Sequence, residues 1–321
     1  MATAGDYRKN ELGPLTADHV HKWIEQFDGE ERLPVLAELD HILKKTYFSE
    51  TSVDSFLEGL AKEPKLVGGD PSRFWKAAGI LDIQQGGNSQ KEMLARFDAI
   101  LKRQTGNNIR NCDASSGDFI YVDDAIFTGN RIWRDLQPWV ANAAPRKATL
   151  HIIVNALHTG GKYYAGQQLT KAFGQAAKDV KVVWWCVTKF ENRKYYKNQS
   201  EVFWPSEFSE GGDDEVSAYV QTLNAAGYPP EKRLQGSTPK DGVFSGEVGR
   251  AAIERAFLKA GARILALCPY LPGSARPLGF SKLMTLGFGA TIVTYRNCPN
   301  NCPLALWAGD PWYPLFSRKT N

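Results

Sequence analysis

The sequence predicts a mixed α/β fold, in which a parallel β-sheet is preceded by a small helical subdomain and followed by a cap. From residue 80 onward, apolar runs alternate with helical patterns, which is the order of elements in a parallel sheet. Within each run, apolar residues follow one another without alternating polar ones, as is typical of strands that are covered on both faces. The residues before them show helical spacing alone. We therefore expect a helical subdomain over residues 1–78 and an α/β domain with its cap over residues 79–321.

Three helices are expected in the N-terminal subdomain. Residues 16–27 read TADHVHKWIEQF, with Thr16 as a helix cap and apolar residues spaced for one helical face. Residues 32–48 and 49–63 continue with the same spacing, and the latter segment begins at a Ser/Thr-rich helix start. A subdomain of this size is small for independent folding, so we expect it to pack on the rest of the chain.

Four strands are expected before residue 190. The apolar runs cover residues 80–84, 118–124, 148–157 and 180–188. Helical patterns separate them, at residues 91–104, 130–140 and 167–177. In the last run, Trp184 and Trp185 must point to opposite faces of the sheet, because successive side chains of a strand alternate.

The pattern weakens after residue 200. One helix is expected within residues 209–227, and a second helix, followed by a strand, within residues 245–270. Another strand is expected at residues 287–295. The tail after it is rich in Pro, Asn and Trp, which suits an ordered cap built from turns.

Composition and charge exclude several classes of protein. No run approaches about 18 consecutive apolar residues, so no membrane span is expected. The N-terminus holds no apolar signal core, and the five cysteines are widely scattered. Both observations indicate a cytoplasmic protein with reduced thiols. With 39 basic and 35 acidic residues, the net charge of +4 is too small for bulk binding of nucleic acid.

Small or polar residues follow three of the predicted strands. These junctions span residues 84–90, 123–131 and 155–166. Open parallel sheets bind ligands at the C-terminal ends of their strands, where each strand leads into a helix. The candidate site is therefore expected at this edge of the sheet.

The middle junction, DDAIFTGNR, combines two acidic residues with a helix start. Residues 128–130 would present backbone N–H groups and the positive end of a helix dipole to an anion such as phosphate, and Arg131 could add charge. Asp123 and Asp124 suit vicinal hydroxyls or a hard cation instead. A ribose 5-phosphate unit needs both features at this spacing. The alternative interpretation is a capped turn beside a solvated Asp pair.

This stretch resembles the PRPP-binding motif of type I phosphoribosyltransferases, in which an apolar strand runs into two acidic residues and a Thr-Gly loop. The resemblance covers FIYVDDAIFTGNR, where Thr128 and Gly129 match the family pattern. It departs at Asn130 and Arg131, where the family usually has Gly-Thr. The resemblance implies that residues 128–131 grip the 5-phosphate, with side-chain donors that differ from those of the family.

The same resemblance assigns roles around this loop. It implies that Asp123 and Asp124 are the catalytic pair, which takes the ribose diol and helps to hold Mg²⁺. In that family, a short loop after an earlier strand binds pyrophosphate, and Gly87, Asn88 and Ser89 stand in the corresponding place. A plain turn is the alternative for these three residues.

The third junction is less specific. Gly160, Gly161 and Lys162 lie where the family often completes the pyrophosphate or acceptor side, and a glycine turn explains them equally well. His158, at the end of the same strand, is a weak candidate acid or base.

These features together imply an enzyme of the phosphoribosyltransferase-like glycosyltransferase class. The fold would be a Rossmann-like parallel sheet of the type I phosphoribosyltransferase kind, with PRPP or a related ribose phosphate as substrate and Mg²⁺ as cofactor. The acceptor stays open. Two other functions are compatible with the motif: a non-catalytic PRPP or nucleotide sensor, and a hydrolase that cleaves a nucleotide with water as acceptor.

A more specific resemblance covers nearly the whole chain. The helical start, GGNSQKEML, FIYVDDAIFTGNRIWRDL and the ending YRNCPNNCPLALW are similar to a bacterial group of phosphoribosyltransferase-like effectors of conflict systems. Members occur in anti-phage loci, including some retrons. The resemblance implies a toxin that a partner keeps inactive, such as a reverse transcriptase with its DNA–RNA product, and it leaves an oligomer open.

Cys298 and Cys302 form a C-x3-C pair near the C-terminal end. A zinc site would need two further ligands, and the nearest histidines, His151 and His158, are distant in the sequence. We therefore expect the segment to shape a turn, in which Asn300 and Asn301 stabilise the backbone.

Overall fold

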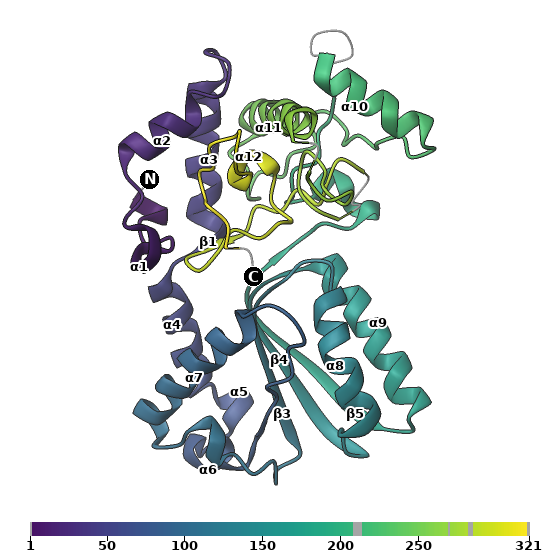
Figure 1. Ribbon diagram of the computed structural model, residues 1–321. Coiled ribbons are helices and arrows are strands. Elements are labelled where there is room, and N and C mark those ends of the chain that lie inside the picture. The colour runs from purple at the N-terminus through teal and green to yellow at the C-terminus, as the bar shows by residue number, and fades with distance from the viewer. Residues whose placement is uncertain (1, 208–213, 269, 282–284, 320–321) are drawn as a thin grey trace. The chain divides into compact units, whose positions relative to one another are not determined.

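The computed structural model describes residues 2–207, 214–268, 270–281 and 285–319 of the chain (Figure 1). The chain forms two compact units. One consists of residues 51–190, and the other combines residues 1–50 with residues 191–320. The domain boundary that the sequence predicts at residue 78 marks the change from helical to strand-and-helix periodicity, whereas the two units are defined by contacts between residues. That boundary stays a prediction. No helix in the described ranges is long and apolar enough to cross a membrane.

The unit of residues 51–190 is built on a four-stranded parallel sheet, with the strand order β2-β3-β4-β5. This confirms the mixed α/β fold with a parallel sheet that the sequence predicts. The long central pair runs in register, with Asp123 of β3 opposite Val154 of β4. The strands are β2 (Gly79–Ile80), β3 (Asp118–Ile126), β4 (Lys147–His158) and β5 (Asp179–Phe190). The helices are α4 (Glu50–Leu60), α5 (Pro64–Val67), α6 (Pro71–Ala77), α7 (Ser89–Thr105), α8 (Asn130–Asn142) and α9 (Thr159–Gln175), with a 3-10 turn η2 (Ile109–Asn111).

Helices cover both faces of this sheet. On one face, α8 and α9 lie side by side (Figure 1). The apolar cluster beneath them includes Tyr121, Leu136, Trp139, Leu150, Ile152, Val154, Leu169 and Phe173. Ile120 and Val122 alternate with Tyr121 along β3 and are 0% exposed, so the opposite face is covered as well. There α7 packs against β3.

The two tryptophans of β5 confirm this alternation. Trp184 packs against the cluster under α8 and α9. Trp185 lies on the other face, where its indole N–H donates to Nδ1 of His151 at 3.1 Å. The Nε2 atom of His151 lies 3.1 Å from the Asp118 carboxylate, so this histidine is a hydrogen-bonded core residue.

Several predicted elements differ from the structure. The strand predicted at residues 80–84 ends at Ile80, because the side-chain oxygen of Gln90 accepts the N–H groups of Ile83 and Gln84, each at 2.8 Å, and draws the chain out of the sheet. Helix α9 begins at Thr159, eight residues before the predicted start, although its first turns contain two adjacent glycines.

Beyond residue 200, both strand predictions need correction. The strand predicted at the end of residues 245–270 is wrong, since α11 continues to Leu267 and keeps burying one helical face as far as Ile264. Of the strand predicted at residues 287–295, only β6 (Val293–Thr294) is a strand, and it pairs in parallel with β1 (Tyr47–Phe48). Pairing between such distant short segments leaves no local sequence pattern.

The second unit is mainly helical around this two-stranded sheet. The predicted cap of α2 is confirmed, because the Thr16 side chain accepts the N–H of His19. Helix α11 packs against α3, α10 and α12 (Figure 1). The helices are α1 (Lys9–Leu12), α2 (Ala17–Ile24), α3 (Arg32–Thr46), α10 (Asp214–Ala225), α11 (Glu247–Leu267) and α12 (Leu304–Trp307), with 3-10 turns η1 (Ala2–Ala4) and η3 (Lys194–Gln199).

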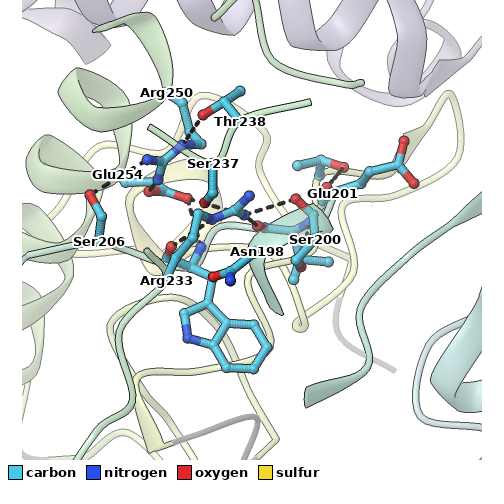
Figure 2. A network of polar contacts seen from close by, with 12 residues as sticks. Asn198, Ser200, Glu201, Ser206, Arg233, Ser237, Thr238, Arg250 and Glu254 are labelled. Atoms are coloured by element: carbon cyan, nitrogen blue, oxygen red, sulfur yellow. Dashed lines mark hydrogen bonds and ion pairs between the residues drawn. The ribbon is translucent and has the colours of Figure 1, made fainter. Parts of the chain in front are cut away.

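A buried network of charges holds the centre of this unit together (Figure 2). Glu254 of α11 forms an ion pair with Arg250 one turn earlier, and its other oxygen lies 3.9 Å from Arg233. Arg233 also donates to the carbonyl oxygens of Ser200 and Trp204, at 2.8 and 3.1 Å. All three charged side chains are at most 2% exposed. Because a buried charge that loses its partner is costly, the network fixes residues 200–204 against α11.

Candidate functional site

The predicted site residues lie at the C-terminal edge of the sheet, on two adjacent strand-to-helix junctions. Asp123 and Asp124 stand near the end of β3, and residues 128–131 lead from it into α8. Residues 87–89 precede or begin α7, the helix between β2 and β3. Parallel strands place these junctions at one edge of the sheet, where doubly wound folds bind their ligands.

Asp123 lies in a buried polar cluster on the α8 side of the sheet. Its Oδ1 accepts the backbone N–H of Asp124 at 2.8 Å, and its Oδ2 lies 3.4 Å from the Tyr121 hydroxyl. The same hydroxyl donates to Asp135 of α8 at 2.9 Å. The Ser89 hydroxyl, which accepts the side-chain N–H of Gln84 at 2.8 Å, lies near enough to lower the pKa of Asp123. The predicted acidic pair and the predicted pyrophosphate loop are thus close together.

The environment of Asp123 shifts its proton affinity. Burial, together with the nearby charge of Asp124, raises the pKa of Asp123 from 3.8 to about 7. The Ser89 hydroxyl and the hydrogen bond from the Asp124 N–H, with the positive charge of Arg131, act in the opposite direction. A buried carboxyl that titrates near neutral pH at the mouth of a parallel sheet is typical of a functional group.

Asp124 is the more accessible of the two acids. It is half-buried, whereas Asp123 is 4% exposed, and the strand directs the two side chains to opposite faces. The backbone carbonyl of Asp124 accepts the side-chain N–H of Asn155, on β4, at 3.3 Å. Asn155 is 1% exposed, and sequence reasoning missed it, although a polar residue inside the apolar run of β4 was a visible signal.

Arg131 joins the two loops. Its guanidinium donates to the backbone carbonyl of Gly86 from the first turn of α8. Asp135, one turn further along α8, accepts the N–H of Gln85 at 3.1 Å. The loop before α7 is therefore held against α8 by two hydrogen bonds. Asp135 is 3% exposed and was not predicted, because its role depends on a loop that is distant in the sequence.

The predicted phosphate loop forms the start of α8. Gly129 is the N-cap residue, with φ at 78°, and it offers no side chain to cap the helix. The N–H of Asn130 lies 3.3 Å from Oγ1 of Thr128, which is a weak hydrogen bond. Backbone N–H groups at this helix start can therefore be presented to an anion.

Two glycines let this loop pack against α9. A Cβ added at Gly129 would overlap the carbonyl oxygen of Gly161, and one added at Gly161 would overlap the carbonyl oxygen of Phe127. The third junction thus supports the second by close backbone contact. Lys162 lies next to this contact, with its ammonium 6.0 Å from the centre of the Trp184 ring.

His158 has a structural position. It is fully buried, its Nδ1 lies 3.0 Å from the carbonyl oxygen of Ile126, and burial lowers its pKa to about 4. It is therefore neutral at physiological pH and holds the end of β3 rather than exchanging protons with solvent.

The acidic pair fits a magnesium ion that is shared with a phosphorylated substrate. Mg²⁺ is usually held by one or two carboxylates together with waters and substrate phosphates, and Asp124, the more accessible acid, is a hard oxygen donor that could supply one such ligand, with the charge of Asp123 nearby. Within the part of the chain that the structure describes, no group of three or more His, Cys, Asp or Glu residues is placed to hold a metal. Cys298 and Cys302 are buried free thiols.

The sequence model of one protein family, PRTase-CE, matches residues 20–318, which is nearly the whole chain. The chain belongs to the PRTase-CE family. This is a family of the phosphoribosyltransferase type, which implies a ribose phosphate substrate. No curated protein and no solved structure matches the chain. In this PRTase-CE protein, the motif that resembles the PRPP site is at the C-terminal edge of the sheet, as that type of fold requires.

Proposed function

We propose that this protein transfers a ribose 5-phosphate unit from PRPP to an acceptor. The observation that supports the proposal is the contact between its two predicted loops: Arg131 donates to the Gly86 carbonyl, and Asp135 accepts the N–H of Gln85. The candidate pyrophosphate loop, the acidic pair and the candidate phosphate loop thereby lie at one edge of the sheet in a protein of phosphoribosyltransferase type.

Each group has a role that follows from its chemistry. The carboxylate of Asp124 would accept hydrogen bonds from the ribose diol, and the buried carboxylate of Asp123 would add negative charge nearby. Residues 128–130 would hold the 5-phosphate at the helix start, and residues 87–89 the pyrophosphate, through backbone N–H groups. Mg²⁺ held by Asp124, with the charge of Asp123 nearby, would neutralise charge on the pyrophosphate. The residues position the substrate and stabilise charge as the bond to pyrophosphate breaks.

We expect Thr128→Val to weaken PRPP binding roughly 10- to 100-fold, because it removes one hydroxyl from the phosphate loop and leaves a charged ligand short of a donor. Titration calorimetry with PRPP and Mg²⁺ measures this loss. The matched control is Thr149→Val, the same change at the opposite end of the sheet, where Thr149 faces Asp118 across β3 and β4. It should leave binding unchanged.

Pyrophosphate release distinguishes the transferase from its two alternatives. With a fractionated cell extract as the acceptor source, a transferase releases pyrophosphate only when the acceptor fraction is present. A hydrolase releases it in buffer, and a sensor binds PRPP without release. A wild-type chain that fails to bind PRPP at all would overturn the proposal.

We further propose that the transferase acts as a toxin in an anti-phage system and is kept inactive by a partner. The resemblance to conflict effectors motivates this step. Expression of the chain alone should arrest bacterial growth, and the double change Asp123→Asn with Asp124→Asn should restore it, because both carboxylates of the ribose site lose their charge.

The control for toxicity is Asp118→Asn, the same chemical change at the other end of β3. It should remain toxic. Growth arrest that survives the double change would contradict the catalytic origin of toxicity, and a harmless wild-type chain would contradict the toxin itself. Copurification with a reverse transcriptase and its DNA–RNA product from the native host would identify the partner.

A further inference from the structure

Strand β5 is a long edge strand with an uncovered apolar sequence. Among the described residues it pairs only with β4, so its outer side has no backbone partner there (Figure 1). It is 12 residues long, whereas β2 at the opposite edge has two. From Val182 to Cys186 every residue is half-buried, and Val187 is 54% exposed. The equivalent stretch of β4 is fully buried.

An exposed edge strand of this kind can pair with a strand of another molecule. Every second residue of an edge strand directs both its N–H and its C=O away from the sheet, and natural proteins avoid leaving a long apolar edge in this state. The strand contains no proline, and its charged residues are Asp179, Lys181 and Lys189, of which the two lysines could deter pairing. Whether these lysines protect the edge depends on what they would face.

We propose that β5 pairs with β5 of a second copy of this chain, antiparallel and about a two-fold axis at Trp184. In this register, Asp179 of each copy stands opposite Lys189 of the other. Both residues are exposed in the single chain, so each is available to form a cross-strand pair. Symmetry makes the contact twice, once at each end of the paired segment.

The charge pattern selects this register over its neighbours. Centring the pair on Trp185 would place Lys181 opposite Lys189, and like charges that face each other directly are unfavourable. Centring it on Val183 would leave Asp179 opposite Val187. Among these three registers, unlike charges meet only with the axis at Trp184, so the edge is complementary to itself, as an isologous contact requires.

The apolar residues also match in this register. Val183 would lie opposite Trp185, and Val182 opposite Cys186, so β-branched residues meet large or soft apolar ones. Val182, Trp184 and Cys186 lie on the face that packs under α8 and α9, and pairing would cover their exposed flanks. The continuous sheet would then contain the strands of both copies.

The test uses one exposed position with two opposite substitutions. In the proposed register Val187 faces Lys181 of the other copy. Val187→Glu should therefore strengthen the dimer, and Val187→Lys should weaken it, each by roughly tenfold in dissociation constant because symmetry doubles the contact. Sedimentation equilibrium of the full chain measures both. Val248, which is 85% exposed on α11, provides the control, since neither Val248→Glu nor Val248→Lys should change the dimer.

A charge exchange tests the register independently. Asp179→Lys alone and Lys189→Asp alone should each weaken the dimer, and the double variant should restore it. A chain that is monomeric up to high micromolar concentration would overturn the proposal. A dimer that responds equally to both changes at Val187, or that the double variant fails to restore, would overturn the β5 contact. A β5 edge that binds only a different protein, and not a second copy of this chain, would also overturn the β5 contact.

Discussion

Replacing Asp123 with Asn should make the free protein more stable at pH 8 and at the same time weaken PRPP binding. The two effects have one cause. The carboxylate is buried beside Asp124, so ionising it in the folded protein is costly. The same ionised carboxylate is the group that would contribute to PRPP binding. Asparagine has nearly the same shape and carries no charge, so it removes both the cost and the function.

The pH dependence follows from the direction of the shift. The pKa of Asp123 is raised in the folded protein from 3.8 to about 7, so between these values the folded chain holds a proton that the unfolded chain has released. Stability from this group is therefore lost as the pH rises from about 4 to about 7, and it stays lost above. At 1.36 kcal/mol per pH unit the loss is up to about 4 kcal/mol.

Urea unfolding of the wild type and of Asp123→Asn at pH 4.5 and pH 8 measures the difference. We expect the free energies of unfolding to differ by only about 1 kcal/mol at the lower pH and by about 4 kcal/mol at the higher pH, with the variant the more stable. PRPP binding at pH 8 should weaken roughly 10- to 100-fold, as for the loss of one charge-assisted hydrogen bond. Asp118→Asn is the control for PRPP binding. A variant that is less stable than the wild type at pH 8 would contradict the shifted ionisation.

The parts of the fold that local sequence determines were predictable. Strands β3, β4 and β5 are long apolar runs, and α7 and α8 carry a helical apolar face, so periodicity located them to within a few residues. The loop at residues 128–131 was predictable for the same reason. Its Thr-Gly sequence lies between the end of a strand pattern and the beginning of a helical pattern. A loop in that position forms a helix start, whose backbone N–H groups can bind an anion.

Other features depend on contacts between distant segments. Asp135 has the sequence environment of an ordinary helix residue, and only the fold brings it to the N–H of Gln85 and the hydroxyl of Tyr121. Gln90 ends β2 through its side chain, which no strand pattern reveals. Arg131 was expected to add charge to the phosphate loop, and its bond to the Gly86 carbonyl adds a second task, which is to hold the neighbouring loop in place.

The start of α9 is the most instructive difference, because Gly161, one of the glycines that made the segment look like a loop, is required by the packing of the helix. Isolated propensities place Gly outside helices, so residues 158–166 were predicted as a loop. In the structure, the second of the adjacent glycines, Gly161, lies against the Phe127 carbonyl, where a side chain has no room. Gly166, five residues later in the same helix, has open space around its Cα.

Alanine at these two positions should therefore change stability in opposite directions. Gly166→Ala should stabilise the protein by about 0.5–1 kcal/mol, because alanine restricts the unfolded chain and favours the helix. Gly161→Ala should destabilise it by about 3 kcal/mol or more, since neither backbone segment can yield without moving the other. Urea unfolding gives both values. The added methyl group would also displace Phe127 and Gly129, so Gly161→Ala should lose PRPP binding even under conditions where it remains folded, while Gly166→Ala keeps it. Equal stability of the two variants would show that α9 does not support the phosphate loop, and the third junction would then have no part in the site.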